Sequence, residues 1–147
     1  MRAQVTHVAL ICNDPTVQPL LPQVVIGDSS TLTVGLQREL EECSPENVHV
    51  WRLGSHWVDV AVLQSIIRAT AAVVRALSPP RRCVLLMDCC PVHLKTEVLQ
   101  TIRACGVSLI LVPAKFTWLR QPLDTHVFNA YKRSLRKQWS RMRMESQ

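Results

Sequence analysis

The sequence predicts an α/β domain in which a mixed sheet is flanked by helices. The first observation is a strand-helix-strand unit, in which apolar runs at 83–88 and 107–112 enclose a helical pattern at 91–105. Strands joined by one crossover helix are expected to lie parallel. The run at 83–88 is apolar on both faces, as a buried central strand would be. The second observation is composition, because 147 residues with 48% hydrophobic side chains suit one domain with a core.

Two strands are predicted ahead of this unit. Residues 5–12 are β-branched and apolar, a turn cluster follows at 13–16, and residues 20–26 are again apolar. This pattern favours a hairpin. Pro22 has no backbone N–H to donate, so it predicts that the second strand lies at an edge of the sheet. Residues 48–51 favour a further short strand.

Helical spacing appears in three segments before the C-terminal region. A short helix is predicted around residues 36–42. A longer one is capped by Ser55 or Asp59, and its apolar positions recur three and four residues apart until a Ser-Pro-Pro turn ends it. The crossover helix of the strand-helix-strand unit is expected to end at Gly106.

The last predicted helix runs from about residue 122 to residue 144, with proline in its first turn. An apolar stripe that includes Phe128 and Leu135 lies along one side, and cations such as Lys137 lie opposite. Asp124 falls on the side of the stripe, so we expect it to face the body of the domain. A carboxylate in the first turn also complements the helix dipole.

The positive charge of the chain is concentrated at its C-terminal end. The net charge is +6, and residues 115–147 carry all of it, while residues 1–114 are neutral overall. A neutral body with a basic end favours a polyanionic partner such as nucleic acid on one surface. The alternative is an ordinary solvated helix face.

The sequence favours an intracellular protein that does not span a membrane. Its longest apolar stretches are strand-length or interrupted by charge, and its N-terminus lacks the pattern of a signal peptide. The six cysteines follow no disulfide-framework spacing, so we expect them to be reduced. They are Cys12, Cys43, Cys83, Cys89, Cys90 and Cys105.

Two acids stand where a metal site could be built. Asp88 closes the apolar run at 83–88, and Asp124 opens the last helix. If the two parallel strands are neighbours, the segments that follow them leave the same edge of the sheet. Two carboxylates that converge there can hold a divalent cation. Singly, each acid has a simpler explanation: Asp88 accepts hydrogen bonds from the following turn, and Asp124 complements the helix dipole.

The residues around these acids resemble a known family. Residues 85–93 (LLMDCCPVH) and 111–124 (LVPAKFTWLRQPLD) look like the DDE superfamily endonuclease domain, and within it the pogo and jerky type of transposase-derived proteins. In that family an apolar strand ends in Asp-Asn with a histidine following, and Leu-Pro-Pro-x-Thr-Thr precedes Gln-Pro-Leu-Asp. The resemblance extends from about residue 5 to residue 139, and Gln-Pro-Leu-Asp is its most specific motif.

This resemblance implies an RNase H-like fold that cuts and joins DNA in the nucleus with two Mg²⁺ ions, or Mn²⁺, held by three carboxylates. By motif, Asp88 matches the second metal-holding acid and Asp124 the third. His93 matches the family's histidine, which orients the site or contacts phosphate. The alternative for His93 is a residue at a helix start that bonds a backbone carbonyl.

Departures from the family pattern predict an incomplete copy. The family's first acid lies on a central strand upstream of the segment matched by residues 5–12, and neither Asp14 nor Asp28 matches it. Cys89 replaces the family's asparagine, and Leu-Pro-Pro-x-Thr-Thr survives only in part, at 112–117. We therefore expect residues 1–147 to form an N-terminally truncated RNase H-like domain of marginal stability. Metal binding is expected only if a third acid is supplied elsewhere.

Two groups of residues near Asp124 are candidates for nucleic-acid binding. The loop before Asp124 interleaves cations with an aromatic ring, which can hold a DNA backbone and stack on a base, although the ring suits core packing equally well. The loop candidates are Lys115, Trp118 and Arg120. The helix candidates are Lys132, Arg133, Arg136 and Lys137. Contacts of these cations with phosphates would weaken as salt rises.

A rival metal site would use thiolates. Cys83, Cys89, Cys90 and His93 could suggest zinc, but they contain no C-x-x-C pair, and a strand at 83–88 would separate Cys83 from the others. Buried, inert thiols are the alternative.

Three functions fit these residues. The first is a metal-dependent nuclease in which Asp88 and Asp124 are completed by a third acid. The second is a catalytically inactive remnant of a transposase that binds nucleic acid through its basic helix. The third is a small interaction module with no role on DNA. No sequence-reading module is visible, so neither a target sequence nor an oligomeric state is predicted.

Overall fold

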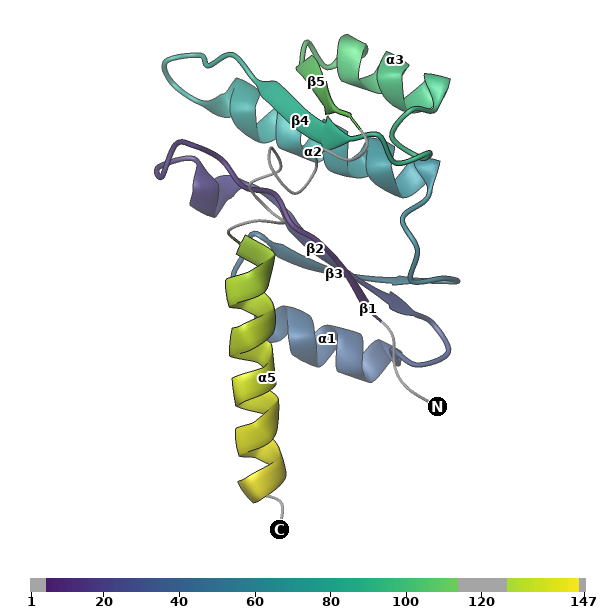
Figure 1. The fold of residues 1–147 in the computed structure, drawn as a ribbon, viewed down its shortest axis with the longest axis vertical. Helices are drawn as coiled ribbons and strands as arrows, with labels where there is room; N and C mark the ends of the chain where they lie inside the picture. The colour runs from purple at the N-terminus through teal and green to yellow at the C-terminus, as the bar shows by residue number, and fades with distance from the viewer. Residues whose placement is uncertain (1–4, 114–126, 146–147) are drawn as a thin grey trace. The chain divides into compact units, whose positions relative to one another are not determined.

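The computed structural model describes residues 5–113 and 127–145 of the chain (Figure 1). The chain divides into two compact units. The first contains the residues up to Leu85 together with Cys90–Leu109, and the second contains Leu86–Cys89 and the chain from Ile110 onward. The mixture of strands and helices confirms the predicted α/β class.

The first sheet contains three strands in the order β1-β2-β3. They are β1 (Val5–Val8), β2 (Gln23–Asp28) and β3 (Val48–Leu53). The predicted antiparallel pairing of the first two is confirmed, and β3 lies parallel to β2 on its other side. The prediction from Pro22 was wrong, because β2 is the middle strand. Pro22 precedes the first ladder residue, so its missing N–H interrupts no pairing.

The strand β1 is shorter than the predicted run at 5–12, because side-chain amides replace the sheet ladder beyond Val8. The backbone N–H of Leu10 donates to Oε1 of Gln23 at 3.1 Å, and the Leu10 carbonyl accepts from Nε2 of both Gln23 and Gln18. A 3-10 helix, η1 (Gln18–Leu20), then carries the chain toward β2. The link is therefore a structured connection and not a tight hairpin turn.

Two helices of the first unit are fixed by side-chain caps. In α1 (Val34–Glu42), which contacts β3, the Thr33 hydroxyl accepts from the backbone N–H of Leu36. In α2 (Val60–Ala76), Oδ1 of Asp59 accepts from the N–H of Val62 at 2.8 Å. Of the two predicted caps, Asp59 is therefore the one used. Each cap satisfies a backbone donor that has no partner within the helix.

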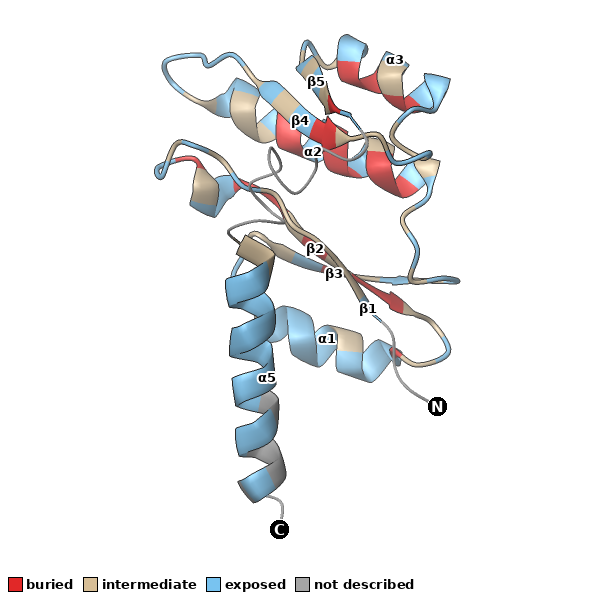
Figure 2. Cartoon of the chain, viewed as in Figure 1, coloured by how far each residue is buried: buried red, intermediate tan, exposed pale blue. Residues whose placement is uncertain are grey.

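The core of the first unit lies between α2 and the three-stranded sheet. Val24 and Ile26 of β2 form a buried cluster with Val62 and Ile66 of α2, and Trp51 of β3 packs at its margin. Figure 2 shows the buried positions on these elements. The alternation of β2 and the helical spacing of α2 each place apolar side chains on one face, so the two faces meet.

The strand-helix-strand unit consists of β4 (Val84–Asp88), α3 (Thr96–Ala104) and β5 (Ser108–Val112). The strands are neighbours in a second sheet. The N–H of Ser108 donates to the Cys83 carbonyl at one end, and Sγ of Cys89 donates to the Val112 carbonyl at the other. The strands therefore run in the same direction, as predicted. Gly106, with φ of 68°, follows α3 in the left-handed conformation that glycine favours.

Two expectations about the sheet are corrected. Among the described residues the strands form two sheets and not one, although the three-stranded sheet is mixed, as predicted. In addition, β4 is not buried on both faces, because Val84 is 56% exposed and Leu86 is 40% exposed, whereas Met87 is buried. On β5, Ile110 is also exposed. These apolar side chains of the two-stranded sheet are therefore not covered as a central strand's would be.

The last described helix is α5 (Phe128–Glu145), within the predicted range at its start and one residue longer at its end. The expectation that its apolar stripe is buried fails at two positions, because Tyr131 and Leu135 are exposed. Among the described helices, none has both the length and the hydropathy needed to cross a bilayer.

Candidate functional site: the carboxyl end of β4

Asp88 is the last residue of β4 and is partly buried. The next residue ties this strand end to its neighbour, since Sγ of Cys89 lies 3.2 Å from the carbonyl oxygen of Val112. Asp88 therefore lies at the edge of the sheet where β5 also ends. The carboxyl edge of parallel strands is where open α/β sheets place their functional groups.

His93 lies in the turn that connects β4 to α3. Its backbone N–H donates to the Cys90 carbonyl at 2.9 Å, and its side chain is partly buried. The helix starts only at Thr96, with Lys95 as a cap residue that makes no side-chain hydrogen bond. His93 is thus placed before the helix and after the acid, on the segment that leaves the carboxyl edge.

The second predicted acid, Asp124, lies outside the described residues. So do the loop candidates Lys115, Trp118 and Arg120. The convergence of Asp88 and Asp124 therefore stays a prediction. Within residues 5–113 and 127–145, no three side chains of histidine, cysteine, aspartate or glutamate gather as metal ligands. At this edge Asp88 supplies one hard oxygen ligand of the kind Mg²⁺ prefers, and the described residues alone do not complete a magnesium site.

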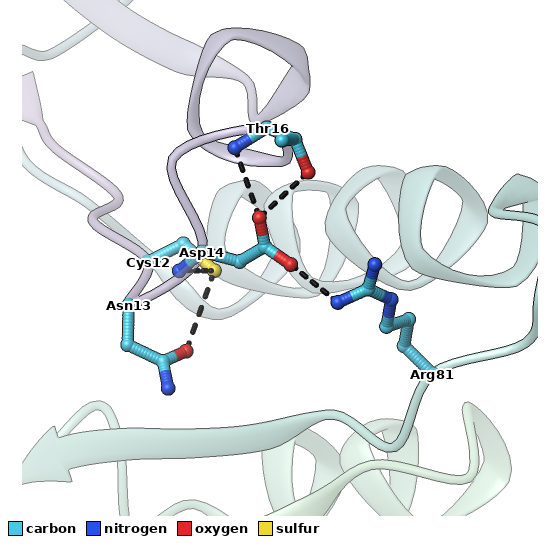
Figure 3. A network of polar contacts seen from close by, with 5 residues as sticks. All are labelled: Cys12, Asn13, Asp14, Thr16 and Arg81. Atoms are coloured by element: carbon cyan, nitrogen blue, oxygen red, sulfur yellow. Dashed lines mark hydrogen bonds and ion pairs between the residues drawn. The ribbon is translucent and has the colours of Figure 1, made fainter.

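Asp14 and Asp28, which match no acid of the family, are engaged in local turns. Oδ1 of Asp28 accepts from the N–H of Ser30 at 2.7 Å, and Oδ1 of Asp14 accepts from the N–H and the hydroxyl of Thr16. These hydrogen bonds hold the pKa of both carboxyls below the usual value. Asp14 is also paired with Arg81, a long-range contact that sequence reasoning missed (Figure 3).

The cysteines of the rival zinc site form no disulfide. The thiol of Cys89 is a hydrogen-bond donor to Val112. Burial raises the pKa of Cys83, and the neighbouring Cys12 adds to the effect. A thiol that stays protonated is a poor zinc ligand, because the metal binds the thiolate. For Cys83, this environment favours the alternative of an inert thiol.

The basic helix α5 presents its cations to solvent. Its nucleic-acid candidates Lys132, Arg133, Arg136 and Lys137 are all exposed, as is Arg141. At 100° per residue, these five positions lie within one half of the helix circumference. Three pairs of them are four residues apart, so like charges repel along the helix. A polyanion bound along this face would relieve that repulsion.

The α/β fold, the acid at a parallel strand end and the basic helix are features that the family resemblance predicts. A family model described as DDE superfamily endonuclease matches residues 3–147 of the chain. The chain therefore belongs to the DDE superfamily endonuclease family. No curated protein and no solved structure matches it significantly.

Proposed function

We propose that this chain is a transposase-derived domain of the pogo and jerky type that binds DNA and cleaves its strands with the help of Mg²⁺ or Mn²⁺. The observation that carries the proposal is Asp88 at the carboxyl end of β4, beside the end of β5. The chain continues from β5 toward Asp124, which by motif is the partner acid. A DNA substrate in turn implies a nuclear location.

Cleavage of a phosphodiester needs an activated water and a stabilised leaving oxygen, and two bound cations supply both. In this proposal Asp88 and Asp124 hold the metal through their carboxylate oxygens. His93 orients the site or contacts phosphate. Lys115, Arg120 and the cations of α5 hold the DNA backbone, while Trp118 stacks on a base.

We further propose an RNase H-like arrangement that is completed by one more strand carrying the third acid. The division of the described strands into β1-β2-β3 and β4-β5 supports this. A strand paired with β1 on one side and β4 on the other would unite the two groups in one mixed sheet. It would also satisfy backbone groups that edge strands leave unpaired.

The chemistry is tested by a nicking assay on supercoiled plasmid with and without Mg²⁺, using a product extended by the upstream coding sequence. We expect Asp88→Ala and Asp124→Ala each to reduce cleavage by at least about a hundredfold, because each removes a metal ligand. Glu46→Ala, which removes an exposed acid, is the matched control. Undiminished cleavage in the Asp88 or Asp124 variant would refute the assigned roles.

The second candidate is a catalytically inactive remnant that retains DNA binding. The exposed, like-charged face of α5 favours it, since binding through this face needs no metal site. The logarithm of the duplex dissociation constant should then rise steeply with the logarithm of salt concentration, by about 0.9 per phosphate neutralised. An affinity that does not change with salt counts against both candidates.

A further inference from the structure

A second basic site lies in the first unit. Three arginines line a hollow of about 400 Å³ near the start of β4. They are Arg75 in the last turn of α2 and the adjacent pair Arg81 and Arg82, which leads into β4. The opposite wall is formed by Cys105–Ser108, the turn between α3 and β5. We call this feature the arginine hollow.

The walls of the arginine hollow are held by specific contacts. Arg81 is anchored by its ion pair with Asp14, which is itself oriented by Thr16 (Figure 3). Nε of Arg75 donates to the Ala71 carbonyl at 3.3 Å. The turn after α3 is joined to the start of β4 by the hydrogen bond from Ser108 to Cys83. The hollow is therefore a built feature of the fold.

The charge of the arginine hollow is unbalanced. Among the residues that the structure describes, no carboxylate lines it; Asp14, the partner of Arg81, lines the adjoining hollow of about 570 Å³. Arg75 complements the negative end of α2, and Arg103 does the same for α3, so neither helix end offsets the charge of Arg82. Arg82 makes no hydrogen bond or ion pair with any residue that the structure describes. It is exposed and available to a ligand.

We propose that the arginine hollow binds phosphate groups of a nucleic-acid backbone. The guanidinium group presents a planar fork of donors that matches two phosphate oxygens, and the Ser108 hydroxyl offers one further donor. The arginines come from two segments, the last turn of α2 and the lead into β4, and they line one volume. Asp88 is the last residue of β4, whereas the hollow is lined by Arg81, Arg82 and Cys83, which precede that strand, so the hollow does not include the acid. This inference rests on the proposed function for the identity of its ligand.

The first test is fluorescence anisotropy with a labelled duplex of about twenty base pairs in two unrelated sequences. We expect Arg75→Ala combined with Arg82→Ala to weaken binding about tenfold for both sequences and to lower the salt slope by about two. Arg82→Lys should retain more affinity than Arg82→Ala, because it keeps the charge. The matched control is Arg68→Ala, which removes one exposed arginine from α2 outside the hollow.

The second test follows backbone and arginine Nε signals in ¹H–¹⁵N spectra during titration with inorganic phosphate. Shifts at Arg75, Arg82 and Ser108 that vanish in Arg82→Ala, together with weakened duplex binding, support the proposal. The same shifts with unchanged duplex binding overturn the nucleic-acid assignment and leave a site for small phosphate compounds. No shifts and no loss of duplex affinity overturn the site altogether. If the parent binds phosphate in the hollow but no duplex, the proposed function fails while the anion site stands.

Discussion

The strands β2 and β4 are both rich in apolar residues, yet they are buried to different extents. In β2, Val24 and Ile26 are almost completely buried, because strands flank β2 on both sides and α2 covers one face. In β4 only Met87 is buried, and the strand has β5 as its single neighbour among the described residues. Burial is therefore decided by the number of neighbours a strand acquires, and not by its apolar composition alone.

The two strands therefore have different roles. The side chains of β2 hold the first unit together, whereas β4 brings an acid to the edge of its sheet. Substitutions in β2 should therefore act on stability, and substitutions at the end of β4 should act on function. The following predictions test that division, beginning with the largest expected effect.

Ile26→Ala should lower the free energy of unfolding by about 3–4 kcal/mol, because it leaves a cavity in the core against α2. Leu86→Ala in β4 should cost about 1 kcal/mol or less, since Leu86 is already partly in water. Urea denaturation followed by circular dichroism measures both. Equal losses for the two variants would show that β4 is as deeply packed as β2, which would remove the contrast.

Gly27→Ala should destabilise the protein by about 1–3 kcal/mol, because a Cβ at this position would lie only 2.7 Å from Cδ2 of Leu32. The matched control is Gly35→Ala in α1, where an added Cβ meets no atom within 4 Å. Removing glycine from a helix should stabilise it by up to about 1 kcal/mol. The same denaturation experiment distinguishes the opposite signs. A neutral Gly27→Ala variant would mean that Leu32 moves aside at no cost.

Features with a local cause could be predicted from the sequence. Asp59 caps α2, Gly106 follows α3, and the crossover between β4 and β5 sets them parallel, since each depends on residues close together in the chain. The place of Asp88 at a strand end followed from the same crossover. The family motifs around Asp88 and Asp124 identified the family, which the matching model over residues 3–147 confirms.

Features that depend on distant neighbours could not be predicted in the same way. Pro22 suggested an edge strand, but β3, which begins twenty residues after the end of β2, pairs with it. No local sequence feature predicts that pairing. The exposure of Leu86 depends in the same way on which strands reach β4. The arginine hollow was also missed, because it combines Arg75 and Arg82 with a turn that follows α3. The adjacent pair Arg81-Arg82 before an apolar strand was the one visible signal.

The smallest predicted effect concerns pH and the first sheet. Burial lowers the pKa of His7 in β1, and a hydrogen bond with Gln23 offsets part of this. Unfolded histidine titrates near 6.5, so as pH falls below about 6.5 the unfolded chain binds a proton before the folded protein does. His7 therefore contributes stability that is fully present above that pH and is lost as pH falls toward its lower folded pKa.

The urea midpoint of unfolding should decrease as pH is lowered from about 7.5 to about 5.5. The decrease should be smaller in His7→Gln. Asp14 and Asp28 do not obscure this window, because their pKa values are lowered and both stay ionised throughout it. The control is His49→Gln, which makes the same substitution at an exposed histidine of β3. An identical slope in the parent and in His7→Gln would mean that β1 does not bury its histidine. The close packing of β2 would then not extend to β1, its neighbour in the three-stranded sheet.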